Sequence, residues 1–148
     1  MKMVIQRVKY ASVTVDNVIV GKIDTGLLVL VGYTHTDTQT DFEKWAKKVV
    51  QMRIFNDEQG KMNLSVVDIK GDILLVSQFT LYADTRKGNR PSYIQAAPPE
   101  IAIPLYEKTI QAFEKVLERP IQKGIFGADM KVELLNDGPV TIVIDTDA

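Results

Sequence analysis

The chain has 148 residues, 45% hydrophobic and 25% charged, which is the length and composition of one globular domain that folds without disulfides or metal. It has no cysteine, which excludes a disulfide scaffold, an iron–sulfur cluster and a cysteine nucleophile. Its single histidine excludes a two-histidine metal site within one chain. Because 18 Lys and Arg residues face 19 Asp and Glu residues, any contact with nucleic acid would have to use a local basic patch.

The first 31 residues have the pattern of β-strands. Residues 3–8 are mostly apolar, and residues 12–15 and 18–23 alternate between apolar and polar side chains. Between the alternating segments lies Asp16-Asn17, a pair that tolerates positive φ and predicts a tight hairpin turn. Residues 27–31 form a continuous apolar run between two glycines, which predicts a strand buried on both faces.

The middle of the chain changes period. Residues 37–52 place apolar side chains at helical spacing with lysines between them, which predicts an amphipathic helix with Thr38 near its N-cap. The acidic residues of segment 56–60 do not have the spacing of a calcium loop, and a solvated turn is predicted there. Residues 73–80 are a further apolar run, predicted as a strand.

The last third begins with a polar, basic loop at residues 85–91, and a second helix is predicted over residues 99–119. Pro104 should either start that helix or kink it. Two final strands, 131–135 and 140–144, are predicted on either side of segment 136–139. We therefore predict a single α/β domain over residues 1–148, with mixed or antiparallel sheets forming a barrel-like core and the two main helices packed on one side.

No segment has the ~20 apolar residues that a membrane span needs, and the first residues have the pattern of an amphipathic strand, not of a signal peptide. We therefore expect no membrane contact and a cytoplasmic location. No cluster of carboxylates has the spacing of metal ligands, so neither a metal nor another cofactor is expected.

Three polar side chains could take part in chemistry. His35 could be a general base, although a solitary histidine in a polar loop is more often simply exposed. Ser77 and Thr80 lie at the end of a predicted strand, where either could be a nucleophile, but the sequence offers no obvious base nearby. Backbone N–H groups at this strand end could instead stabilise an oxyanion, or the two hydroxyls could only hydrogen-bond the turn.

Two loops are further candidates. The Gly138-Pro139 step between two strands has the pattern of an ordinary turn, and an X–Pro bond in a folded protein is usually trans. Arg86, Lys87 and Arg90 lie close together in the sequence and are followed by Tyr93. Such a segment could hold phosphates and stack a base, or it could be a solvated charged loop.

Four motifs together carry a family resemblance. They are residues 5–8 (IQRV), residues 53–55 (RIF) leading to 60–64 (GKMNL), residues 77–81 (SQFTL) and residues 136–141 (NDGPVT). In this order and spacing the chain resembles the D-aminoacyl-tRNA deacylases, once called D-tyrosyl-tRNA deacylases, over essentially its whole length. Each motif is weak alone, and the four in register are a strong signal.

The resemblance implies a cytoplasmic homodimer, with its active site at the interface, that hydrolyses the ester joining a D-amino acid to the 3′ end of tRNA. It also implies that glycine on tRNA is accepted. Gly138 and Pro139 would form a cis peptide that reaches into the partner's active site and excludes L-amino acids, and Arg7 would hold the Gly138 region in orientation. Phe79 and Val140 match the main branch of the family, not a related animal branch.

The resemblance assigns catalysis to the segment of Ser77, Gln78, Phe79 and Thr80. Thr80 could form an acyl-enzyme. Alternatively, the 2′-OH of the substrate's ribose could assist water while N–H groups around Phe79 and Thr80 stabilise the oxyanion; the lack of a base favours this second mechanism.

Arg86, Lys87 and Arg90 are the candidates for contacting RNA phosphates, and Tyr82 or Tyr93 for stacking. The rival hypotheses are a non-catalytic, dimeric RNA-binding module and a hydrolase of small esters.

Overall fold

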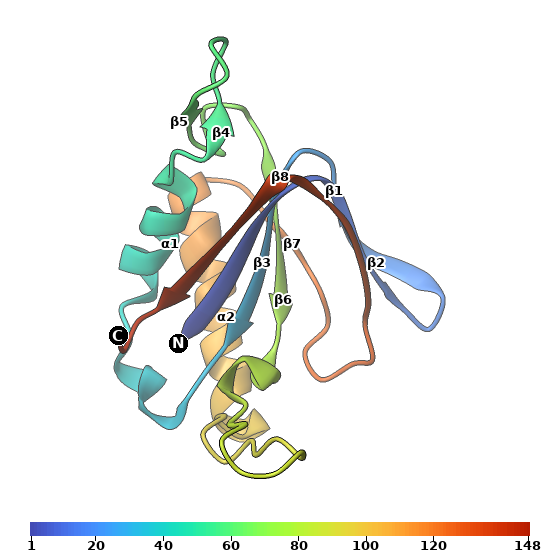
Figure 1. Cartoon of the computed structure of the whole chain (residues 1–148), viewed down its shortest axis with the longest axis vertical. Coiled ribbons are helices and arrows are strands. Elements are labelled where there is room, and N and C mark those ends of the chain that lie inside the picture. The colour runs from blue at the N-terminus through green and yellow to red at the C-terminus, as the bar shows by residue number, and fades with distance from the viewer.

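The computed structural model describes all 148 residues and contains a six-stranded mixed sheet, a separate two-stranded hairpin and two α-helices (Figure 1). The strands are β1 (Lys2–Val15), β2 (Val18–Ile23), β3 (Gly26–Gly32), β4 (Phe55–Asn56), β5 (Met62–Leu64), β6 (Asp72–Ser77), β7 (Gln122–Lys123) and β8 (Lys131–Asp145). The helices are α1 (Phe42–Gln51) and α2 (Pro99–Leu117), and two 3-10 turns are η1 (His35–Gln39) and η2 (Phe79–Tyr82).

The six-stranded sheet curls until it nearly closes. Its order is β2-β1-β3-β6-β7, with β8 pairing on the other side of β1. The outer strands β2 and β7 approach each other, because the Lys22 N–H donates to the Gln122 side chain at 3.2 Å. A Cβ on Gly21 would lie only 2.7 Å from the Lys123 carbonyl oxygen, so glycine permits this close approach. These contacts confirm the predicted α/β class with a barrel-like core.

Both helices cover the same face of the sheet (Figure 1). Alternate residues of the central strands divide between two cores: Leu27 and Leu75 pack in the larger core beneath the helices, and Leu28 and Leu74 in the smaller core inside the curled sheet. This alternation confirms that residues 27–31 are buried on both faces. Neither helix combines the length and the hydropathy of a membrane-spanning segment.

The first helix begins later than predicted, and Thr38 is not its N-cap. The carboxylate of Asp41 caps α1 by accepting a hydrogen bond from the Lys44 N–H at 3.1 Å. The preceding residues form η1, because buried Asp37 accepts hydrogen bonds from the Thr34 N–H and from the amino group of Met1, both at 2.7 Å.

The predicted strand boundaries also need correction. The runs 3–8 and 12–15 are parts of the single strand β1, and residues 131–135 and 140–144 are parts of the single strand β8. The strand predicted over 73–80 ends at Ser77, so Thr80 lies in η2.

The hairpin turn at Asp16-Asn17 is confirmed, with φ of 50° and 64°. Helix α2 starts at Pro99 and ends at Leu117, two residues before the predicted end, and Pro104 lies inside it.

Candidate active site

The carboxyl end of β6 presents a short run of polar and backbone groups. The Gln78 N–H donates to the Val31 carbonyl at 2.7 Å, which fixes the point where the chain leaves the sheet. The chain then turns into η2, whose first hydrogen bond runs from the Leu81 N–H to the Gln78 carbonyl at 3.2 Å, with no side-chain cap. The N–H groups of Phe79 and Thr80 precede that bond, in the position where a helix leaves donors without an intrahelical acceptor.

No general base lies against Thr80. Its hydroxyl accepts a hydrogen bond from the Gln78 side-chain amide at 2.6 Å and contacts neither a carboxylate nor an imidazole. His35 is exposed in η1, and its Nε2 lies 3.1 Å from the Ile94 carbonyl oxygen. The segment therefore offers backbone donors and an amide-bound hydroxyl, without the nucleophile–base pair that a covalent mechanism requires.

A hollow of about 250 Å³ opens beside this strand end. One wall is formed by residues 76–79, and the other by the segment from Phe126 to Val132, which includes Met130. The Phe79 side chain is 54% exposed and meets Tyr93 edge to face, with ring centroids 5.1 Å apart. A larger hollow, about 720 Å³, lies along the exposed face of α1 and contains none of the candidate residues.

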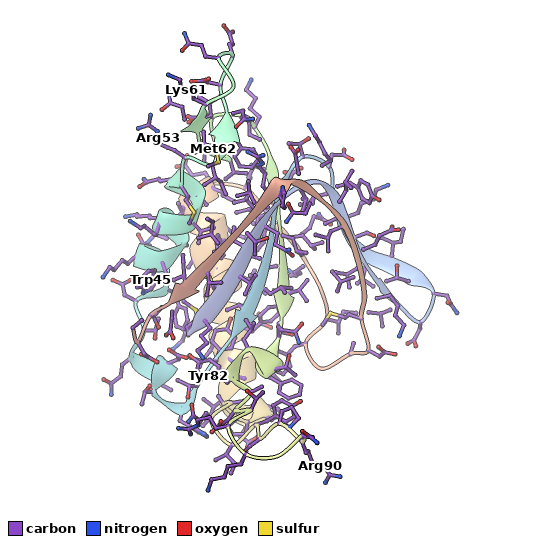
Figure 2. The ribbon with its side chains drawn as sticks, in the orientation of Figure 1. Trp45, Arg53, Lys61, Met62, Tyr82 and Arg90 are labelled. Carbon is purple, nitrogen blue, oxygen red and sulfur yellow. The ribbon has the colours of Figure 1, made fainter.

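The basic loop lies at the same end of the molecule as η2, and Figure 2 shows Arg90 projecting outward from its tip, below Tyr82 in the view. Arg86 is already paired, because its Nη2 donates to Asp84 Oδ2 at 2.6 Å. This hydrogen bond lowers the pKa of Asp84 to about 2. Lys87 and Arg90 are exposed and form no ion pair.

The stacking prediction for Tyr82 is wrong. Its ring is only 5% exposed, and the ammonium group of Lys2 lies 4.7 Å from the ring centroid. Tyr93, at 42% exposed, is the tyrosine of the two whose ring is open to a ligand.

The second candidate segment leaves the regular ladder of the sheet. Gln6 pairs with Thr141 and Val8 with Asn136, so residues 137–140 of β8 all stand opposite the single residue Arg7. We call residues 137–140 the Gly138 bulge. The Gly138-Pro139 bond is cis, so the trans bond expected from the pattern alone is wrong.

Gly138 itself could not be replaced without strain. Its φ is 137°, a region that essentially only glycine adopts. A Cβ there would lie 2.8 Å from Arg7 Nη2 and 2.9 Å from Val140 Cγ2.

Arg7 ties the Gly138 bulge to a distant hairpin. Its buried guanidinium donates from Nε to the Asp137 carbonyl at 2.8 Å, and from Nη1 to the Ile54 carbonyl at 2.7 Å and to Asn56 Oδ1 at 3.5 Å. Exposed Lys9 reaches Asp137 Oδ2 at 3.5 Å. The structure thus brings Arg7 to the Gly138 region.

The two candidate segments lie at opposite ends of the sheet (Figure 1). Val31 pairs with both Met3 and Ser77, which sets the catalytic candidates at the level of Met3, whereas the Gly138 bulge stands beside Arg7 and Val8. The five-residue step from Met3 to Val8 alone spans roughly 16 Å of strand. One chain therefore does not bring Ser77–Thr80 and Gly138-Pro139 into one site.

Sequence reasoning missed several residues around both segments. Phe126 and Met130 line the hollow, but they come from a loop without a recognisable pattern. Ile54 and Asn56 hold Arg7, and Asn56 directly follows the RIF motif at 53–55. Asn136 hydrogen-bonds across the bulge, and it stands in the NDGPVT motif. The signal that could have found Asn56 and Asn136 was therefore their place beside or within a family motif.

Comparison with known proteins agrees over the whole chain. A family model described as "D-Tyr-tRNA(Tyr) deacylase" matches residues 4–145. Proteins named D-aminoacyl-tRNA deacylase from Flavobacterium psychrophilum and Parabacteroides distasonis are 59% and 57% identical to this chain over 146 residues, which cover 99% of this chain and 97% of each relative.

Two solved structures share the fold. The "c-Myc DNA Unwinding Element Binding Protein" is 42% identical with a TM-score of 0.92, and the match covers 100% of both chains. A "probable eukaryotic D-amino acid tRNA deacylase" is 15% identical with a TM-score of 0.82 over 97% of both chains, a likeness of fold alone. On the family match and these identities, the chain belongs to the D-aminoacyl-tRNA deacylases, hydrolases that act on the ester bond of aminoacyl-tRNA.

Proposed function

We propose that this protein removes D-amino acids, and glycine, from tRNA in the cytoplasm, and that it spares L-aminoacyl-tRNA because of the shape of its backbone. The observation that carries the proposal is the Gly138 bulge. It exposes Gly138 and Pro139 at the surface, is held by buried Arg7, and lies far from the chain's own Ser77–Thr80 segment. An exposed Gly-Pro step that pairs with no residue of β1 and is held on either side suits a site completed by a second chain.

The second chain is a second copy of this one, and the outer strand supports a homodimer. β8 has 15 residues and pairs only with β1, so one whole side of it is free. Long free edges are usually covered or blunted in stable proteins. Val143 is 67% and Leu135 50% exposed on this strand, and a second copy would cover them. The active site of each copy would then combine its own residues 77–80 with the partner's Gly138 bulge.

Selectivity follows from main-chain shape. With the backbone of Gly138 and Pro139 against the α-carbon of the aminoacyl group, an L side chain would collide with it and a D side chain would point away. Glycine has no side chain to reject. Rejection by a clash needs no contact with the accepted side chain, so one enzyme can take many D-amino acids.

For catalysis we propose hydrolysis assisted by the RNA itself. The N–H groups of Phe79 and Thr80 would stabilise the oxyanion, and the ribose 2′-OH of the substrate would assist the attacking water. Because Thr80 has no adjacent base, it is a poor candidate for a nucleophile. Ser77 and Gln78 complete this segment, with Gln78 holding the Thr80 hydroxyl at 2.6 Å.

The 3′ end of the RNA would enter past the basic loop. Lys87 and Arg90 are free to contact phosphates, and Arg86 would join them if it left Asp84. Tyr93 and Phe79 offer exposed aromatic surface beside the hollow, on which an unpaired base could stack.

The decisive experiment follows deacylation of matched D- and L-aminoacyl-tRNA by the purified protein. We expect the D-form and glycyl-tRNA to be hydrolysed and the L-form to survive. Equal hydrolysis of both enantiomers would refute the shape argument, and binding without hydrolysis would favour the RNA-binding module. Equal activity on free D-amino acid esters that lack the RNA would favour the small-ester hydrolase.

The mechanism is tested separately with Thr80→Ala and with a substrate ending in 2′-deoxyadenosine. The variant should keep most of its activity on the normal substrate, and the wild type should lose activity on the deoxy substrate. A folded Thr80→Ala protein without turnover, together with a trapped acyl-enzyme, would establish the covalent mechanism instead.

A further inference from the structure

The side chain of Asn136 reaches across the Gly138 bulge to its last residue, Val140, whereas Arg7 bonds its first residue, Asp137. Its Oδ1 accepts a hydrogen bond from the Val140 N–H at 2.8 Å. Its Nδ2 donates to the Val140 carbonyl and to Thr141 Oγ1, both at 3.2 Å. One short amide therefore satisfies both main-chain polar groups of Val140, as a neighbouring strand would.

This contact replaces a missing part of the β-ladder. Regular pairing with β1 stops at Asn136 and resumes at Thr141, and residues 137–140 have no paired residue in β1. Arg7 fixes the entry to the bulge through the Asp137 carbonyl, and Asn136 fixes the exit through Val140. Gly138 and Pro139 lie between these two fixed points and are exposed.

The chemistry of the position points to asparagine. A carboxylate could accept from the Val140 N–H but could not donate to its carbonyl, and an alanine could do neither. The amide is partly buried, so its loss would leave main-chain groups without their hydrogen bonds while Arg7 still held the other end.

We propose that Asn136 is a positioning residue for chiral selection, which holds the Gly138-Pro139 backbone where an L side chain would collide with it. This inference rests on the proposed function. The added claim is that rejection of L-aminoacyl groups depends on the side-chain amide of Asn136, which acts through the bulge and not by touching the reacting atoms. Loosening the exit of the bulge should then admit L-aminoacyl groups before it harms hydrolysis of the D-form.

The test measures kcat/KM on matched D- and L-aminoacyl-tRNA for the wild type, Asn136→Ala and Asn136→Asp. Gln51→Ala, which removes an exposed amide at the end of α1, away from both candidate segments, serves as the matched control. We expect Asn136→Ala to lower the ratio of D to L activity by about tenfold, the effect of losing one or two hydrogen bonds. Asn136→Asp should lower it less, because it keeps the bond from the Val140 N–H, and Gln51→Ala should leave it unchanged.

The outcomes separate this inference from the proposed function. A wild type that does not hydrolyse D-aminoacyl-tRNA refutes the function itself. An active wild type whose folded Asn136 variants keep its D to L ratio, or lose both activities in equal proportion, overturns the positioning role. Should Asn136→Ala fail to fold, the Asp variant, which replaces one nitrogen by oxygen, decides in its place.

Discussion

The two ends of β3, beside Arg7 and beside Ser77, differ in how fully the polar groups around them are engaged. At the Gly138 end, side chains take up the bonds that the ladder lacks: Arg7 contacts Asp137 and Ile54, and Asn136 contacts Val140. At the Ser77 end, the first N–H groups of η2 precede the first helical hydrogen bond, and Phe79 is 54% exposed. One end is closed and fixed, and the other is open to a ligand.

The proposed selection by shape makes two separate demands, and this difference matches both. A backbone that rejects a side chain by collision must not move, because a shift of about 1 Å would remove the clash and admit the side chain. Donors for a developing charge must be free until the substrate arrives. In this fold the two demands are met far apart, and only the pairing of two chains would bring them to one substrate.

The largest effect should come from Arg7→Ala. This change leaves the Asp137 and Ile54 carbonyl groups without a buried, charged donor. We expect the free energy of unfolding to fall by about 3 kcal/mol, and the D to L ratio of deacylation to fall further than in the Asn136 variants. Denaturant unfolding and the paired deacylation assay measure the two effects.

Lys9→Ala is the matched control for Arg7, because Lys9 contacts the same residue from the surface, with its Nζ 3.5 Å from Asp137 Oδ2. It should cost less than about 1 kcal/mol and leave selectivity intact. If the two variants behaved alike, the closed end would be held by surface charge, and the contrast with the open end would disappear.

Gly138→Ala should have the next largest effect. The new methyl group would lie 2.8 Å from Arg7 Nη2, in a backbone conformation with φ of 137°. We expect a loss of stability of about 1–3 kcal/mol and a clear loss of D-specific deacylation, because the bulge must shift.

Gly60→Ala is the control for the strain of placing a side chain at positive φ. Gly60 has a φ of 76°, but a Cβ there meets nothing within 4 Å. It should destabilise the protein modestly and leave the D to L ratio unchanged. A Gly138→Ala protein with wild-type selectivity would show that the exposed bulge does not meet the substrate.

Much of the fold could be predicted because its signals are local. The two-sided apolar run at 27–31 and the Asp16-Asn17 turn each carry their explanation within a few residues, and both are confirmed. The start of α1 was missed because the amino group of Met1 binds the carboxylate of Asp37 and holds it in the interior. Thr40 donates to the same carboxylate, so residues 37–40 form a separate turn before the helix. The contact between Met1 and Asp37 joins residues 36 positions apart, which no local pattern records.

Local pattern marked Ser77, Thr80 and Gly138-Pro139 as separate candidates, and only the family motifs joined them into one candidate site. Periodicity reads residues 131–144 as two strands and a turn, because nothing local shows that Arg7 stands opposite the bulge and keeps β8 continuous. Tyr82 was a reasonable stacking candidate by type, but its burial against Lys2 depends on how η2 packs on β1. Residues 77–80 and 138–139 belong to one site only if two chains meet, and one sequence cannot place a second chain.

The smallest effect concerns the open end, where Asp84 pairs with Arg86. Arg86 holds the pKa of Asp84 at about 2, below the ordinary 3.8, so the carboxylate stays charged until the pH falls through about 2. The pair therefore persists through mildly acidic as well as neutral conditions, and lowering the pH to 4 will not release Arg86. Asp84→Asn should release Arg86. Binding of tRNA that carries no amino acid should then become about threefold stronger at low salt, with a steeper salt dependence.

Two further variants show whether the gain belongs to Arg86. Asp16→Asn removes the same charge at the β1–β2 turn and should change tRNA binding little. Adding Arg86→Ala to Asp84→Asn should abolish the gain, because no freed guanidinium would remain. If Asp16→Asn strengthened binding as much as Asp84→Asn, net charge alone would explain the effect. The proposed path of the RNA past the basic loop would then be wrong, and Lys87 and Arg90 would no longer be candidates for contacting its phosphates.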